Sequence, residues 1–112
     1  MLEGLFGNKS MELVLLNLFH YSSIHGRAIA RNINQYPSAI AKQLDKLEAM
    51  GLVVSQEQGR TRVYQFNPKS PYVKPLKDLL AITYNSMSYE MKRELFAERG
   101  RPRAKGKEII KK

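Results

Sequence analysis

The stretch YPSAIAKQLDKLEAMGLVV, residues 36–54, holds a helix with recognisable ends and the start of a strand directly behind it. Pro37 suits the first turn of a helix, where its missing N–H is not needed, and Gly51 suits the left-handed residue that follows the last turn. The apolar residues between them recur at helical spacing and predict a narrow buried stripe formed by Ile40, Leu44 and Leu47. We therefore expect an amphipathic helix from Pro37 to about Met50.

Two further helices are expected upstream, a long one over about 10–21 and a short one over about 27–33. Ser10 is the expected N-cap of the long helix, and Asn34 tolerates the left-handed conformation that ends the short one. Residues 11–19 of the long helix include only two polar side chains. A helix this apolar must bury more than one face, either in its own core or against a second subunit.

Downstream, the segments 52–54 and 62–66 are rich in β-branched and aromatic residues and predict a β-hairpin with a polar connection over 56–61. The prolines within 67–71 end this hairpin, because proline cannot donate to a ladder. A final long helix is expected over about 72–97. Its apolar residues form one seam at spacings of three and four: Leu76, Leu80, Tyr84, Met87, Met91 and Leu95.

The expected order is therefore helix, short helix, helix, hairpin and long helix. Two short helices with a tight link, the second followed at once by a hairpin, form the layout of a winged helix-turn-helix. We expect a mainly α fold with a small β-hairpin and a long C-terminal helix. We also expect three parts: a winged helix-turn-helix DNA-binding domain over 1–70, a C-terminal dimerisation helix over 71–98, and a disordered basic tail over 99–112.

In a helix-turn-helix, the second helix enters the major groove of DNA with its N-terminal half leading. The side chains at that end are the expected base readers, namely Ser38, Ala39, Lys42, Gln43 and Lys46. Lys42 can donate to guanine and Gln43 can pair with adenine, whereas the two small side chains permit close approach. On the hairpin, Arg60 and Arg62 share one strand face, from which arginine can bind phosphate or the minor groove. The alternative for both groups is an ordinary solvated surface.

The formal net charge is +9, and most of the excess lies at the C-terminal end. Residues 99–112 hold seven Lys and Arg against one Glu, whereas residues 1–70 hold eight against five Asp and Glu. Such a tail either contacts phosphate or only keeps the protein soluble. The run RGRP over 99–102 is also similar to the core of an AT-hook, which enters the minor groove of A·T tracts. The tail residues expected to contact DNA are Arg99, Arg101 and Arg103.

Enzymatic and metal-binding classes find little support in the sequence. The chain has no cysteine, which removes disulfides, thiolate metal sites and cysteine nucleophiles. His20 and His25 are five residues apart, a spacing that does not place them on one helical face. We therefore expect no enzyme activity, no metal and no cofactor. Without a signal peptide or a long apolar run, we expect the protein in the cytoplasm.

Taken together, these motifs resemble the winged-helix regulators related to the ArsR and MarR groups. The resemblance extends from Leu5 to Leu80, about two thirds of the chain, and its matching pieces lie at residues 5–9, 29–34, 36–53, 59–60, 64 and 67–72. Gln35 and Tyr36 depart from the family pattern, which usually has an apolar residue followed by an N-capping serine. The resemblance implies a prokaryotic transcriptional regulator that binds a palindromic operator as a homodimer.

A second class stays open beside this one. Related winged helices also serve as protein-interaction or accessory modules, for example beside nucleotidyltransferases, without specific readout of DNA. That class predicts weak and salt-labile binding that is indifferent to DNA sequence.

Overall fold

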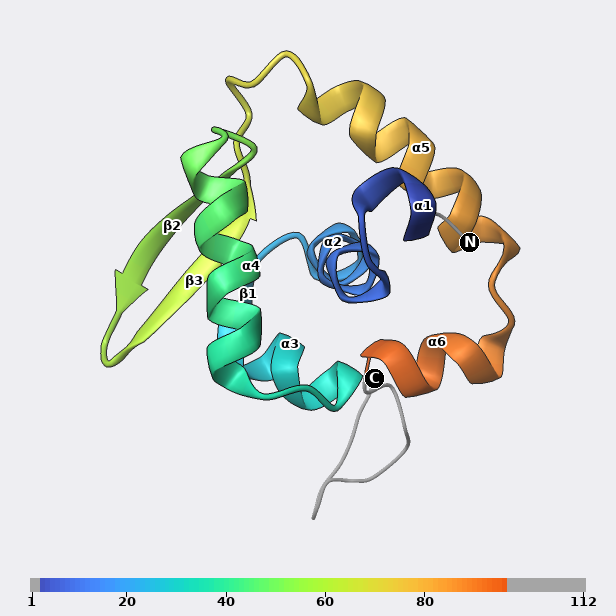
Figure 1. The fold of residues 1–112 in the computed structure, drawn as a ribbon, viewed down its shortest axis with the longest axis horizontal. Helices are drawn as coiled ribbons and strands as arrows, with labels where there is room; N and C mark the ends of the chain where they lie inside the picture. The colour runs from blue at the N-terminus through green and yellow to red at the C-terminus, as the bar shows by residue number, and fades with distance from the viewer. Residues whose placement is uncertain (1–2, 97–112) are drawn as a thin grey trace.

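The computed structural model describes residues 3–96, and the expected DNA contacts at Arg99, Arg101 and Arg103, with the AT-hook-like run, lie outside this range. Its chain runs from a short N-terminal helix to a C-terminal helix pair (Figure 1). In order, the elements are α1 (Glu3–Phe6), α2 (Lys9–Tyr21), β1 (Ile24–His25), α3 (Gly26–Ile33), α4 (Pro37–Ala49), β2 (Val53–Gln58), β3 (Thr61–Phe66), α5 (Val73–Ser86) and α6 (Tyr89–Phe96). None of the helices in this described part is long and apolar enough to cross a membrane.

Helix α2 lies at the centre of the fold, with the other long elements arranged around it (Figure 1). Every residue from Glu12 to Leu18 is buried, because α3, α4, α5 and α6 contact different sides of this helix. Burial of one leucine side chain contributes about 1.5–3 kcal/mol. The apolar surface of α2, for which the sequence left a second subunit open, is thus covered by the chain's own helices.

Two buried amides add polar contacts to this core. The Nδ2 group of Asn17 donates to the carbonyl oxygens of Leu13 at 3.0 Å and Leu95 at 3.3 Å. The Nδ2 group of Asn32 donates to Asn17 Oδ1 at 2.9 Å. These bonds satisfy amides that would otherwise be costly to bury, and they join α2, α3 and α6 in one arrangement.

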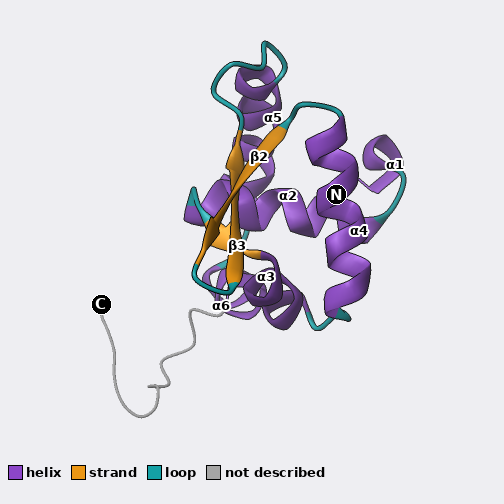
Figure 2. Cartoon of the chain, turned by 90° about the vertical axis from the view of Figure 1, so that its left-hand side faces the viewer, coloured by secondary structure: helices purple, strands orange, loops and turns teal. Residues whose placement is uncertain are grey.

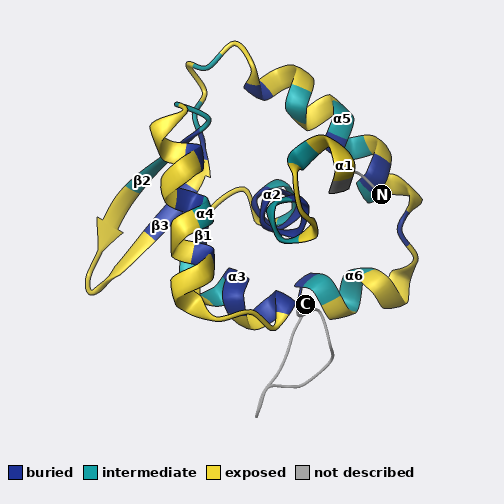
Figure 3. Cartoon of the chain, viewed as in Figure 1, coloured by how far each residue is buried: buried dark blue, intermediate teal, exposed yellow. Residues whose placement is uncertain are grey.

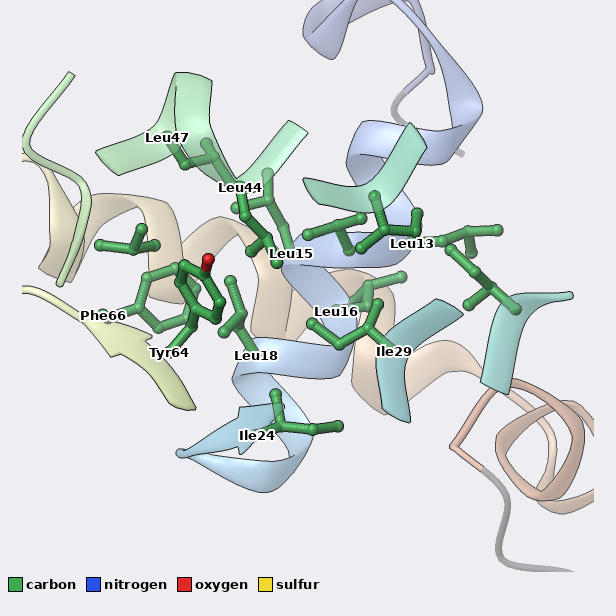
Figure 4. Packing of buried hydrophobic residues seen from close by; sticks show 14 of the residues in the cluster. Leu13, Leu15, Leu16, Leu18, Ile24, Ile29, Leu44, Leu47, Tyr64 and Phe66 are labelled. Atoms are coloured by element: carbon green, nitrogen blue, oxygen red, sulfur yellow. The ribbon is translucent and has the colours of Figure 1, made fainter. Parts of the chain in front are cut away.

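The helix-turn-helix pair forms as the sequence predicts. Asn34 ends α3 in the left-handed region at φ 58°, and Gly51 follows α4 at φ 79°. The predicted stripe of α4 is buried against α2 and the sheet, as Figure 4 shows for Leu44 and Leu47. Together with the hairpin behind α4, these helices confirm the winged helix-turn-helix fold.

The sheet is larger than the predicted hairpin. β2 and β3 extend to the register pair Gln58 and Thr61, so a two-residue turn of Gly59 and Arg60 replaces the longer connection expected over 56–61. Gly59 has φ 64° and is the turn's only residue with positive φ, as in a type II′ turn, whose twist suits a hairpin. The short strand β1 adds a third member on the other side of β3 (Figure 2).

The single C-terminal helix expected over 72–97 is instead two helices. Met87 is extended, and Ser88 directly precedes α6, with its Oγ accepting from the N–H of Met91 at 3.1 Å. The break turns α6 back toward α2, so that Phe96 is fully buried and stacks on His20 with ring centroids 4.3 Å apart. A straight helix would carry Phe96 away from this core, and its burial favours the bend.

The N-cap of α2 also differs from the sequence prediction. Asn8, not Ser10, occupies the cap in an extended conformation, and its Oδ1 accepts from the N–H of Met11 at 2.7 Å. Ser10 lies one residue inside the helix. A side chain within the helix cannot reach the first-turn N–H groups as a cap does.

This difference predicts unequal effects of two substitutions. Asn8→Ala should lower the free energy of unfolding by about 1 kcal/mol, because a first-turn N–H of α2 loses its acceptor. Ser10→Ala is the matched control and should leave stability nearly unchanged. Urea unfolding followed by circular dichroism measures both, and a larger loss for the Ser10 variant would contradict the assigned cap.

Candidate nucleic-acid interface

The outer face of α4 is open to solvent, because its apolar stripe faces the core (Figure 3). The side chains exposed on this face are Ser38, Ala39, Lys42, Asp45, Lys46 and Ala49. Four of the five predicted base readers therefore lie together on one surface. Neither Lys42 nor Lys46 forms an ion pair or side-chain hydrogen bond within residues 3–96, so both ammonium groups are available to a ligand.

Gln43 lies apart from these four residues. It is half-buried, and its Oε1 atom is shielded from solvent without a hydrogen-bond partner in the described part of the chain. Helical spacing accounts for this position, since Gln43 follows Ile40 by three residues and precedes Leu47 by four. To reach a base, this side chain would have to leave its present position.

A groove of about 350 Å³ runs beside α4, between the first turns of α3 and α4 and the hairpin. We call it the arginine groove. Its polar lining consists of His25, Arg27, Ser38, Arg60, Thr61, Arg62 and Tyr64. All its lining residues lie in the described part of the chain, and none of them carries a carboxylate. The lining residues of the arginine groove thus carry the positive charge of three arginines and no negative charge.

The walls of the arginine groove meet closely at Gly26, the first residue of α3. A Cβ atom added to this glycine would lie 3.2 Å from Leu44 Cδ1, which is tighter than ordinary contact. The absence of a side chain therefore lets the start of α3 approach α4. Arg27 follows directly and is exposed, so the first turn of α3 places it on one wall of the groove.

Both helices begin at the arginine groove without a side-chain cap. The N-cap residues His25 and Tyr36 make no such hydrogen bond, and neither helix has an acidic residue in its first turn. Free N–H groups at a helix start carry partial positive charge. They add to the field of the arginines, and Tyr36 leaves this end of α4 without a side-chain cap.

The two predicted arginines of the hairpin differ in their contacts. The side chain of Arg60, in the turn, has no hydrogen bond or ion pair within residues 3–96. Arg62 donates from Nη1 to Ser55 Oγ at 2.8 Å and from Nη2 to Glu57 Oε2 at 3.2 Å. Both line the arginine groove, but only Arg60 has all its donors available.

Arg27 is a groove residue that sequence reasoning did not identify. The feature of the sequence that could have indicated it is the position of Arg27 in the first turn of α3, the first helix of the helix-turn-helix pair. That turn lies across from the hairpin tip in a winged helix, but only the folded chain shows the two on one groove.

Tyr64 joins the arginine groove to the core, because it lines the groove and its ring packs in the core (Figure 4). Burial raises the pKa of Tyr64 above its usual value, and the carboxylates of Asp45 and Glu48 raise it further. The Arg62 guanidinium acts in the opposite direction. The neutral phenol is therefore the form that folding favours.

This fold and surface define a winged helix-turn-helix domain, and the solved structures that resemble it include the following two. One is a MarR family transcriptional regulator from Silicibacter pomeroyi DSS-3, with a TM-score of 0.56 and 19% identity, covering 74% of this chain and 59% of that chain. The other is a mutant of ZitR from Lactococcus lactis in apo form, with a TM-score of 0.54 and 18% identity, covering 80% of this chain and 76% of that chain. The chain thus spans about three fifths of the length of the Silicibacter regulator. No protein-family model and no curated protein sequence matches the chain.

The environment of Tyr64 predicts a pH dependence of stability. Because its folded-state pKa is raised, its contribution is complete below the unfolded pKa of about 10 and is lost as the pH rises through the folded value. The free energy of unfolding should therefore fall with pH above about 10, and it should fall less steeply in Tyr64→Phe. Denaturant unfolding at several alkaline pH values measures this, and equal slopes for the two proteins would contradict it.

Proposed function

We propose that the protein regulates transcription by binding double-stranded DNA in a sequence-specific manner as a dimer. The observation that carries this proposal is the exposed face of α4 beside a groove that has three arginines and no carboxylate among its lining residues. DNA offers a major groove about 12 Å wide, which admits one helix, and a phosphate backbone beside it. The fold shared with a MarR family transcriptional regulator supports the same function.

The proposed interface divides its residues by role. The N-terminal half of α4 reads base edges, with Lys42 and Lys46 as donors and small Ser38 and Ala39 allowing close approach. Arg27 and Arg60, which both line the arginine groove, bind backbone phosphates beside the inserted helix. The basic tail, outside the described residues, adds further phosphate or minor-groove contacts in this proposal.

The dimer in this proposal uses the outer surfaces of α5 and α6. Several large apolar side chains are exposed there, including Ile82 at 70% and Tyr89 at 72%. Apolar surface gathered on neighbouring elements is typical of protein contacts. A two-fold dimer would place two α4 helices on successive turns of a palindromic operator.

The competing function is a protein-interaction module without specific readout of DNA. The observation that favours it is an apolar groove of about 440 Å³ at the junction of α4 and α5, away from the arginine groove. Its lining includes Met50 and Tyr72, which are 68% and 71% exposed. Under this function, DNA binding would be weak and independent of sequence.

The first test is selection of bound duplexes from a random DNA pool with the full chain. On a selected site, Lys42→Ala and Lys46→Ala should each reduce discrimination against random DNA by about 1–3 kcal/mol, because base contacts are lost. Arg27→Ala and Arg60→Ala should instead weaken both kinds of DNA and lower the salt slope by about one each. Titration at several salt concentrations measures these effects.

Lys69→Ala is the charge-matched control for this test. Lys69 is exposed in the loop between β3 and α5. This loop lies at the opposite end of the hairpin from the turn that carries Arg60. It should change neither discrimination nor the salt slope by a comparable amount. Equal losses on selected and random DNA for all the α4 variants would contradict base readout by this helix.

The dimer predicts a particle of twice the chain mass at micromolar concentration, measured by light scattering. Ile82→Asp should shift this mass toward that of one chain, because it places a charge in an apolar contact. Tyr36→Asp, at an exposed position on the start of α4, is the control and should leave the dimer intact. A single-chain mass for the unaltered protein would exclude this part of the proposal.

A further inference from the structure

Four side chains link the recognition helix to the hairpin through consecutive hydrogen bonds. Ser55 Oγ on β2 donates to Glu48 Oε2 on α4 at 2.8 Å. The same Oγ accepts from Arg62 Nη1 on β3 at 2.8 Å, and Arg62 Nη2 donates to Glu57 Oε2 on β2 at 3.2 Å. We call this chain of Glu48, Ser55, Arg62 and Glu57 the wing tie.

The strand register explains why these groups meet. Glu57 lies opposite Arg62, and Ser55 lies opposite Tyr64, one step closer to the core. Alternate residues of a strand share a face, so Arg62 and Tyr64 point to the same side of the sheet, toward α4. Tyr64 and the sheet's inner residues pack in the core, and the wing tie continues that face outward toward the turn.

Ser55 and Arg62 each form two hydrogen bonds in the wing tie. A hydroxyl has one proton and two lone pairs, so Ser55 can donate to Glu48 and accept from Arg62 at the same time. The planar fork of Arg62 reaches two acceptors at once, which a single ammonium group cannot do in the same geometry. The Arg62 side chain is 47% exposed, but two of its donors are already bonded within the protein.

The core fixes the inner end of the hairpin against α4, so the wing tie concerns its outer end. Among the side-chain hydrogen bonds of residues 3–96, only the bond between Ser55 and Glu48 joins α4 to the hairpin. The outer part of the hairpin from Gln56 to Arg62 is exposed and projects away from the helices (Figure 1). The charges of Glu48 and Arg62 both affect the pKa of Tyr64, so the wing tie passes close to this phenol.

We propose that Arg62 acts as a positioning residue, which through the wing tie holds the turn and Arg60 at a set distance from Lys42 on α4. This proposal rests on the proposed DNA-binding function. Exposed ion pairs and hydrogen bonds contribute little to folding, so the wing tie adds little stability. Its effect is on binding, because a hairpin already held in place loses less conformational freedom when Arg60 meets a phosphate.

Arg62→Lys separates positioning from direct contact. A lysine keeps the charge for phosphate but cannot bridge Ser55 and Glu57 as the arginine does. As a positioning residue, Arg62→Lys should weaken binding to a selected duplex by about three- to tenfold, and Ser55→Ala should do the same. Ser55→Thr keeps a hydroxyl and should restore most of the affinity. If Arg62 is a phosphate contact, Arg62→Lys binds like the unaltered chain and Ser55→Ala has no effect, which overturns the proposal.

A double-mutant cycle provides a readout that a merely structural role would not change. With the wing tie intact, Arg60→Ala should lower affinity by the factor expected for one phosphate contact. In the Ser55→Ala background the same substitution should cost clearly less, because the turn is no longer held in place. An equal factor in both backgrounds overturns the proposal.

The control for these variants is Asp78→Ala, which breaks the exposed pair between Lys74 and Asp78, 3.3 Å apart on α5. It should leave affinity unchanged, and thermal unfolding of every variant should stay close to that of the unaltered chain. The two proposals fail in different ways. A full chain that binds no duplex overturns DNA binding and the role of Arg62 together, whereas specific binding that is insensitive to Ser55→Ala and Arg62→Lys overturns the role of Arg62 alone.

Discussion

The enclosure of α2 is the constraint on which the rest of the structure depends. Leu16 and Leu18 are fully buried, and the helices around α2 contact it on different sides. A close-packed core does not let one helix move without its neighbours, so α2 determines where α4 and the sheet lie. The hydrogen bond between Asn32 and Asn17 fixes the orientation of α3 relative to α2, because a buried amide pair has a defined geometry and an apolar contact does not. The position of the recognition helix is therefore set by the centre of the molecule.

Local signals in the sequence identified much of this fold. Asn34 and Gly51 have the positive φ that helix ends need, and such residues act through their own backbone preferences. The break at Met87 could not be found in this way, because the apolar seam continues through it at spacings of three and four, both of which fit one helix. The break exists because Phe96 packs on His20, which lies far earlier in the chain. A periodicity shows which face is apolar but not whether one straight helix can bury all of it.

The candidate site was predictable only where a single helix determines it. The exposed positions of α4 followed from its buried stripe, and a stricter use of the same spacing would have set Gln43 apart from them. Arg27 lies on a wall that only the packing of α3 against α4 brings near the hairpin. The partner of Arg62 within β2 follows from the register of the hairpin. The link onward through Ser55 to Glu48 depends on the angle between hairpin and helix, for which the sequence has no local signal.

Arg60 and Arg62 have the same chemistry and lie two residues apart, but their surroundings give them different states. A guanidinium whose donors face water gains a partner when it meets a phosphate, whereas one bonded to a carboxylate must exchange one partner for another. The net gain from a phosphate is therefore larger at Arg60. Arg62 is instead the more restrained of the two side chains. The turn that carries Arg60 has no side-chain hydrogen bond to α4, whereas the hydrogen bonds of Arg62 lie directly behind that turn. Under the proposed function, affinity for DNA depends on the charge of Arg60 and on the hydrogen bonds by which Arg62 holds the turn in place.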